Sequence, residues 1–185
     1  MIKNFVSNIE IVDKILPNIS TKIGEFRELH ERNQIEAFGL AIRIYILLCC
    51  KMIGYLEEFY KDLLFKEKTI SDKEVGRTIS YLIASLNDLI ASGNLLVVSY
   101  RFGACYPSNF YLVLKGNYAT IALLFSNAIN VLNKYKDDKE KLRKYLGNLM
   151  YSFSSLKEVL IGAVHLFECV DFDLYNRRKN CKRNR

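Results

Sequence analysis

The 185-residue sequence contains few of the residues that interrupt regular structure, with only nine glycines and two prolines. A sandwich or barrel of many short strands needs more turn residues, so this scarcity disfavours an all-β fold. Tryptophan is absent, and the five cysteines form no C-x-x-C pair, which disfavours a zinc site. Half of the residues are hydrophobic, which is too many for a disordered chain. These features together predict a globular protein built from long helices.

Catalytic motifs are also missing. The sequence holds no Walker loop, G-x-G-x-x-G, G-x-S-x-G or H-E-x-x-H motif. The two histidines, His30 and His165, are too few for most histidine-based sites, and no base pairs convincingly with a serine or cysteine nucleophile. The longest uncharged run, Gly116–Asn133, carries several polar side chains that are costly in hydrocarbon. That run therefore predicts a buried helix or an oligomer interface, and no membrane span.

The N-terminal sequence, the cysteines and the net charge predict the location of the protein and the kind of partner it binds. Asn8, Glu10 and Asp13 interrupt any apolar segment of a signal peptide. Together with the unpaired cysteines, this predicts a cytoplasmic protein. Lysine and arginine total 27 against 20 acids, a net charge of +7, which favours a polyanionic partner.

Apolar residues recur at helical spacing along most of the chain. The pattern predicts helices over residues 2–30, 35–67, 72–100 and 138–168, with Asn33 as an N-cap of the second. Ser71 and Glu74 are spaced as a capping box at the start of the third helix. Asp137 and Asp138 suit the positive N-terminal end of the last one. Two further pieces, 108–115 and 117–134, are predicted to meet at a corner. The expected fold is all-α: one domain over residues 1–175, with about six or seven helices in an antiparallel bundle. Residues 176–185 are expected to form a basic tail that is disordered alone.

Two carboxylates differ from the others, most of which stand in solvated charge runs. Glu58 and Asp88 are each flanked by apolar residues near the middle of a predicted helix. Two acids on adjacent helices of a bundle can share a divalent ion. The alternative, that each acid lies at the edge of a polar helix face, is favoured by the pattern alone.

Several segments, taken in order, resemble one known family. Gly54–Phe65, GYLEEFYKDLLF, resembles the translin/TRAX helix with a Q-E-F-V-E-A type motif, and Ser71–Gly76 resembles the connection after it in archaeal TRAX-like proteins. Leu82–Ser92, LIASLNDLIAS, is similar to the helix that reads Y-L-x-G-x-x-D-x-x-G-E. Lys115-Gly116-Asn117-Tyr118 resembles the R-G-D-F/Y corner, and Leu142–Leu160 resembles the closing helix. The similarity spans roughly residues 35 to 165.

This resemblance implies an archaeal-type, all-helical protomer of about seven helices in a closed homo-oligomer, such as an octamer-like shell, with room for a second family subunit. It also implies binding of RNA or single-stranded DNA on a basic inner surface. TRAX-like members hold Mg or Mn ions with a cluster of acids and cleave RNA. A metal there lowers the pKa of its bound water and neutralises developing charge.

Of the family's four acids, this chain retains two. Glu58 matches the first acid of E-x-x-E, and Lys61 stands at the second. Asp88 matches the acid of D-x-x-G-E, and Ser92 stands at the closing glutamate. An ammonium group beside the site repels a divalent ion. The resemblance therefore implies a degenerate site, with Glu58 and Asp88 as the remaining candidates for catalysis and for holding Mg or Mn.

The resemblance also selects four basic residues as candidates for binding nucleic acid. Lys51 and Lys61 flank Glu58 on a helix that contributes to the cavity wall in this family, and Lys61 is interpreted as a phosphate contact. Arg143 and Lys144 match the family's L-R-K. Independently of the family, the basic residues of the tail, 176–185, predict an electrostatic arm.

Three functions are compatible with these features. The first is a nucleic-acid-binding subunit of a translin/TRAX-like oligomer, with no membrane contact. The second is an active Mg- or Mn-dependent endoribonuclease built on Glu58 and Asp88. The third is a helical scaffold without a nucleic-acid role, whose positive charge gives solubility.

Overall fold

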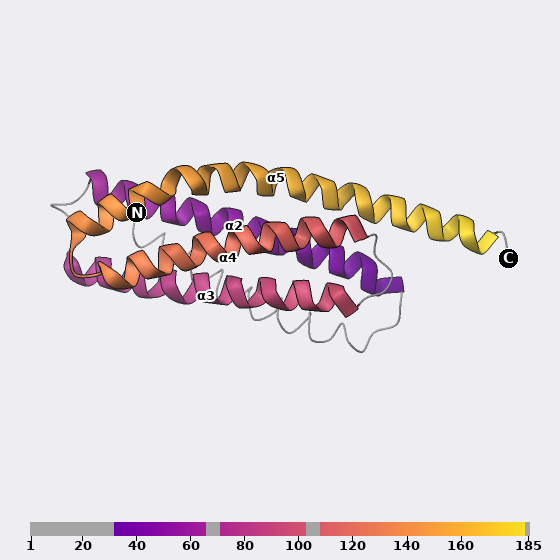
Figure 1. Ribbon diagram of the computed structural model, residues 1–185, viewed down its shortest axis with the longest axis horizontal. Coiled ribbons are helices and arrows are strands. Elements are labelled where there is room, and N and C mark those ends of the chain that lie inside the picture. Colours follow the sequence, from indigo (N-terminus) through magenta and orange to yellow (C-terminus); the bar gives the residue numbers. More distant parts are fainter. Residues whose placement is uncertain (1–31, 66–70, 103–107, 184–185) are drawn as a thin grey trace.

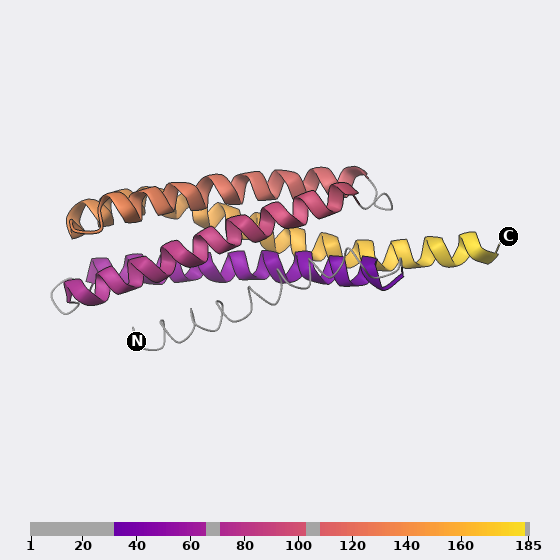
Figure 2. The same cartoon turned by 90° about the horizontal axis from the view of Figure 1, so that it is seen from below.

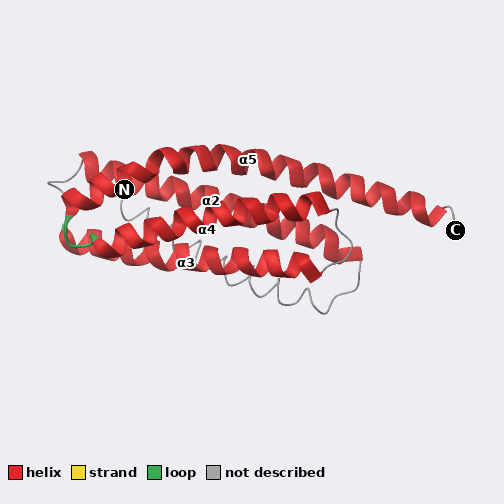
Figure 3. Ribbon diagram, in the orientation of Figure 1, coloured by secondary structure: helices red, strands yellow, loops and turns green. Residues whose placement is uncertain are grey.

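The computed structural model describes residues 32–65, 71–102 and 108–183, and every regular element in these ranges is a helix. The four helices are α2 (Arg32–Phe65), α3 (Asp72–Phe102), α4 (Ser108–Lys134) and α5 (Lys139–Arg183). Figure 3 shows them in red, with the turn between α4 and α5 in green. The predicted all-α class is thus confirmed for these ranges. The helix predicted over residues 2–30 lies outside them.

The four helices run alternately up and down, so that each is antiparallel to the next (Figure 1). Within the bundle, α2 packs chiefly along α5, and α3 packs chiefly along α4. Contacts between α4 and α5 and between α2 and α3 join these two pairs. The C-terminal part of α5 extends beyond the ends of the other three helices, as both views show (Figures 1 and 2).

Each helix contributes one apolar stripe to a shared core, because its large hydrophobic residues recur every three or four positions. The aromatic rings of Phe125 on α4 and Phe153 on α5 are fully buried, with their centroids 6.3 Å apart. Their tilted arrangement is favourable for two aromatic rings. The core residues of the other two helices are buried to the same degree and include Tyr45, Met52, Leu56, Leu82, Leu86 and Leu89.

Two glycines allow large side chains to approach a neighbouring helix. A Cβ atom at Gly93 on α3 would meet the hydroxyl of Tyr45 from α2 and would lie 2.6 Å from the ring of Tyr118 from α4. A Cβ atom at Gly147 on α5 would lie 2.8 Å from the hydroxyl of Tyr60 on α2. Real Cβ atoms do not approach other atoms so closely, so a larger residue at either position would force these tyrosine side chains to move.

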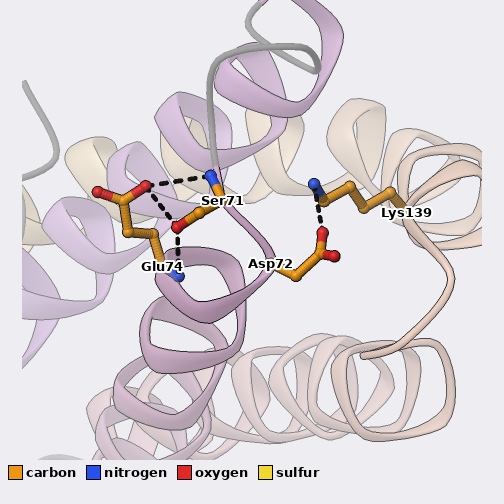
Figure 4. Close-up of polar contacts among 4 residues, drawn as sticks. All are labelled: Ser71, Asp72, Glu74 and Lys139. Atoms are coloured by element: carbon orange, nitrogen blue, oxygen red, sulfur yellow. Dashed lines mark hydrogen bonds and ion pairs between the residues drawn. The ribbon is translucent and has the colours of Figure 1, made fainter.

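The capping box predicted at the start of α3 is confirmed (Figure 4). The Ser71 backbone N–H and hydroxyl both donate to Oε2 of Glu74, at 3.1 and 2.9 Å, and the Glu74 N–H donates to the Ser71 hydroxyl at 3.3 Å. The hydrogen bonds from the Ser71 side chain and backbone lower the pKa of the Glu74 carboxyl below its ordinary value. They satisfy amide groups that the first turn of a helix leaves without partners.

Replacing Ser71 with Ala is expected to destabilise the fold at neutral pH by about 1 kcal/mol, the usual cost of losing a serine N-cap. A lowered carboxyl pKa adds stability above the ordinary pKa of glutamate, and this is lost as the pH falls through the folded value. The difference between wild type and Ser71→Ala in urea unfolding should therefore shrink from neutral to acid pH. Ser80→Ala is the control, because Ser80 bonds the Gly76 carbonyl within α3. A difference independent of pH would contradict the role of Glu74.

A second polar contact in Figure 4 joins the first residues of two helices. Lys139 of α5 lies 2.6 Å from a carboxylate oxygen of Asp72 on α3. Nearby, Asp138 accepts a hydrogen bond of 3.0 Å from the Lys141 N–H and thus caps α5. This bond is the main reason why the pKa of the Asp138 carboxyl is lowered, and a hydrogen bond from the Lys141 side chain adds to the effect. An acid at this position was predicted from the suitability of carboxylates at a helix N-terminus.

The corner predicted at Lys115-Gly116-Asn117 is wrong, because α4 continues through it as one helix. Leu114 and Ile121 on either side are buried on the same face, so packing favours a continuous helix. One glycine in a helix costs only about 1 kcal/mol, which this burial outweighs. Gly116 has no positive φ angle, and its carbonyl accepts a hydrogen bond from the Thr120 hydroxyl.

Two predicted helix ends also differ from the structure. Asn33 lies inside α2, which begins at Arg32, so it is not the N-cap of that helix. Helix α5 continues to Arg183, past its expected end at 168 and through most of the tail predicted to be disordered. No glycine or proline interrupts residues 166–183, and leucine, lysine and arginine are good helix formers. An apolar pattern is therefore not needed to continue the helix there.

Candidate nucleic-acid interface

The two predicted metal-binding acids lie at different levels of the bundle. The contact between Tyr45 and Gly93 fixes the register of α2 against α3. Since the helices are antiparallel, Glu58 lies 13 residues along the bundle from this contact, and Asp88 lies five residues from it in the same direction. The difference of eight residues corresponds to about 12 Å along the axis. Oxygen ligands of one Mg ion lie about 2 Å from it. This offset does not favour a shared ion, and the pairing of Glu58 with Asp88 stays a prediction.

The other two positions of the predicted site hold no acid and differ in burial. Lys61 is exposed on α2, whereas Ser92 is 5 % exposed and packs beside Gly93 inside the bundle. Glu57, one residue before Glu58, pairs with Lys157 of α5 at 3.2 Å. Over the residues that the structure describes, no group of three or more histidine, cysteine or acidic side chains could hold a metal. The Mg or Mn site stays a prediction without a supporting geometry.

The four predicted nucleic-acid-binding residues lie on α2 and at the start of α5. Lys61 and Lys144 are exposed, and Arg143 is half-buried, all toward the end of the bundle where α2 ends and α5 begins. Lys51 is also exposed, but it lies ten residues before Lys61, or about 15 Å away along α2. Its ammonium group is 5.8 Å from the centre of the Tyr55 ring. The four basic residues therefore do not form one compact cluster.

Two tyrosines at the same end of the bundle were not predicted to be functional. The rings of Tyr135 and Tyr145 are stacked in parallel with centroids 4.5 Å apart, and Lys134 lies 5.4 Å from the centre of the Tyr135 ring. A hydrogen bond with Tyr135 is the main reason why the pKa of Tyr145 is raised. Tyrosines next to lysines, as in Lys134-Tyr135-Lys136, were the available sequence signal. Such a pair can stack on a nucleic-acid base beside cations that contact phosphate.

The most basic segment lies at the other end of α5. Residues 177–185 hold six arginine or lysine residues and no acid, and α5 includes all but the last two of these positions. We call residues 177–183 the basic arm. It lies 33 residues after Lys144, or about 50 Å along the helix. The structure thus separates the basic arm widely from Arg143 and Lys144.

The two cysteines with described side chains are not suited to nucleophilic catalysis. Cys49 is fully buried, and burial raises the pKa of its thiol far above the ordinary value, against a smaller opposing effect of the Tyr45 hydroxyl. Burial also raises the pKa of the neighbouring Cys50 thiol, although Lys157 opposes the shift. A thiol that stays protonated is a poor nucleophile. Both residues therefore act as small core side chains.

One helix has the length and composition of a membrane span. In the part of the chain that the structure describes, α3 over Asp72–Val98 passes this test, and 39 % of the stretch is buried within the bundle. Core helices of soluble proteins have the same composition, so a single such helix is weak evidence. The expected absence of a membrane partner stays a prediction.

Comparisons with known proteins identify no relative. No family model matches the sequence, and no curated protein or solved structure matches it. Membership of the translin/TRAX family therefore stays a prediction that rests on the motifs alone. One of those motifs, the corner at Lys115-Gly116-Asn117-Tyr118, lies within a continuous helix.

Proposed function

We propose that this protein binds RNA or single-stranded DNA, and that the basic arm of α5 provides the main phosphate contacts. The observation that carries the proposal is the arm itself, a helical extension of the bundle with five basic residues and no acid among residues 177–183. Because the arm continues beyond the other helices, a polyanion can approach it with Asp171 and Asp173, just before it on α5, as the nearest acids in sequence (Figure 1). Cations grouped in this way bind nucleic acid through phosphates.

The other end of α5 offers a second, weaker set of contacts. Arg143, Lys144 and the stacked pair Tyr135 and Tyr145 combine cations with aromatic rings, as single-strand-binding surfaces do. Acids dilute this end, because Asp137, Asp138 and Glu140 stand among the lysines. The basic arm is therefore expected to dominate the affinity. Translin-like family membership and a shell-like oligomer are compatible with this function, but the proposal does not depend on them.

Neutralising the basic arm is expected to weaken binding of a mixed-sequence single-stranded RNA at least about tenfold at low salt. The variant replaces Arg177, Arg178, Lys179, Lys182 and Arg183 with Gln, which keeps the length and helix propensity of the segment. It should also reduce the dependence of affinity on salt, since each lost phosphate contact lowers the slope of log K against log salt by about 0.7. Fluorescence anisotropy at several salt concentrations measures both quantities.

The matched control replaces Arg143 and Lys144 with Gln, and it is expected to lose less affinity than the arm variant. If the arm variant bound RNA as tightly as wild type, with an unchanged salt slope, the basic arm would not be the binding element. A larger loss in the control would instead assign binding to the residues that the family resemblance selects. No affinity of the wild type at low salt would exclude nucleic-acid binding altogether.

A further inference from the structure

Long stretches of α3 and α4 differ from the other helices in carrying almost no charge. Asp88 is the one charged residue between Thr78 and Val98 of α3, and none occurs between Gly116 and Asn133 of α4. Exposed side chains of both signs stand on the other helices, among them Lys51, Glu58 and Lys61 on α2 and Lys141, Lys144 and Glu158 on α5. Residues 78–98 of α3 and 116–133 of α4 are thus nearly uncharged, whereas α2 and α5 carry exposed charges of both signs.

The uncharged positions are exposed and lie in stripes. On α4, Leu123 is 62 % exposed and stands near the middle of a row of exposed residues. The spacings in this row alternate between three and four residues, so the whole row lies on one side of the helix. The exposed members of this row are Gly116, Ala119, Leu123, Ser126, Asn130 and Asn133. A corresponding row on α3 consists of Ser80, Ala84, Asn87, Ala91, Asn94 and Val98. We call the two rows the α3–α4 face.

The α3–α4 face is large enough to hold two proteins together. The α4 row spans about 27 Å at 1.5 Å per residue, and two neighbouring helices are together about 20 Å wide. Covering such a face on each of two molecules removes about 1,000 Å² of surface in total, which is the lower range of specific interfaces. Small side chains also allow the backbones of two helices to approach closely.

We propose that the α3–α4 face is the contact surface of a homodimer, with a second copy of this chain as its occupant. The net charge of +7 opposes association of two copies at most orientations. The repulsion is smallest where two uncharged faces meet, and the cores of protein interfaces are depleted in charge for this reason. In a two-fold pair each copy presents the same rows, so Leu123 near the centre contacts the same region of the second copy.

A lipid bilayer suits this face less well than a protein does. Asn87, Asn94 and Asn130 stand along the rows, and Asp88 lies beside them. The amide groups of these asparagines are costly to place in hydrocarbon. Between two copies, the amides can donate and accept hydrogen bonds across the interface. The proposed face includes no residue of α5 or its basic arm, so the dimer does not depend on the nucleic-acid function.

The test is sedimentation equilibrium of the full chain over a range of concentrations. Wild type is expected to dimerise, and Leu123→Glu and Ala91→Glu are each expected to raise the dimer dissociation constant at least about 30-fold, as at other interface hot spots. The control is Tyr151→Glu, which places the same charge on α5 at a side chain that is 84 % exposed, and it should dimerise like wild type. Circular dichroism establishes that each variant folds. Having one variant on each helix keeps the test valid if either fails to fold.

Three outcomes would overturn the proposal. The first is a wild type that remains monomeric up to about 100 μM, because its dimer affinity would then be too weak for a specific complex. The second is a dimer that tolerates both glutamates, or that Tyr151→Glu weakens equally, since either result places the contact elsewhere. The third is flotation of wild type, but not of Leu123→Glu, with neutral phosphatidylcholine vesicles, which would make the α3–α4 face a lipid-binding surface.

Discussion

Replacing Phe153 with Ala is expected to lower the free energy of unfolding by about 3 to 5 kcal/mol, the usual cost of removing a buried phenylalanine ring. Phe153 is fully buried on α5 and contacts Phe125 of α4, so its loss leaves a cavity between two helices. The surrounding side chains come from long, closely packed helices and can collapse only partly. Urea unfolding followed by circular dichroism measures the change.

The matched control for this variant stands two residues earlier. Tyr151 is also an aromatic residue of α5, but it is 84 % exposed, so Tyr151→Ala is expected to change the stability by no more than about 0.5 kcal/mol. Similar losses for the two variants would mean that the buried face of α5 is assigned wrongly. In that case the packing of α5 against α4 would need revision.

Replacing Gly93 with Ala is expected to destabilise the protein by about 1 to 3 kcal/mol, the usual cost of overpacking a core. The added methyl group would meet the Tyr45 hydroxyl and the Tyr118 ring. Tyr45 is 1 % exposed and has little room to move. In a helix, alanine is more favourable than glycine by about 1 kcal/mol. A net loss of stability would therefore mean that the steric conflict costs more than this gain.

Gly54→Ala is the control, since a Cβ atom at Gly54 on α2 has nothing within 4 Å. This substitution is expected to be neutral or to stabilise the fold. Adding Tyr45→Phe to Gly93→Ala removes the hydroxyl that the methyl group meets, and should recover part of the loss in a double-mutant cycle. Additive effects of the two substitutions would contradict close contact between Tyr45 and Gly93.

Local signals predicted the helices better than they predicted helix ends. The pair Ser71 and Glu74 located the start of α3 to within a residue, because a capping box is formed by neighbours in sequence. At Gly116 the local signal was misleading, since the buried residues on either side favour a continuous helix. The extension of α5 was missed because it follows from helix propensity rather than from an apolar pattern.

The candidate sites depended on tertiary register, which sequence does not contain. Asp88 stands near the middle of α3, as predicted, whereas Glu58 lies in the last quarter of α2. The contact of Tyr45 with Gly93 implies an offset of about eight residues between them along the bundle. Spacing within one helix cannot reveal this offset. The basic residues of the tail, in contrast, are contiguous in sequence, so the arm was recognisable without knowledge of the packing.

The pairing of α2 with α5 affects the order in which the chain can fold. Successive helices α3, α4 and α5 are joined by short connections, so their contacts close small loops at little entropic cost. The partner of α2, however, is the last helix, and their contacts require the intervening chain to be ordered. During synthesis, α2 emerges long before α5 and has its main partner only at the end. Until then, the apolar stripe of α2 is exposed to other chains.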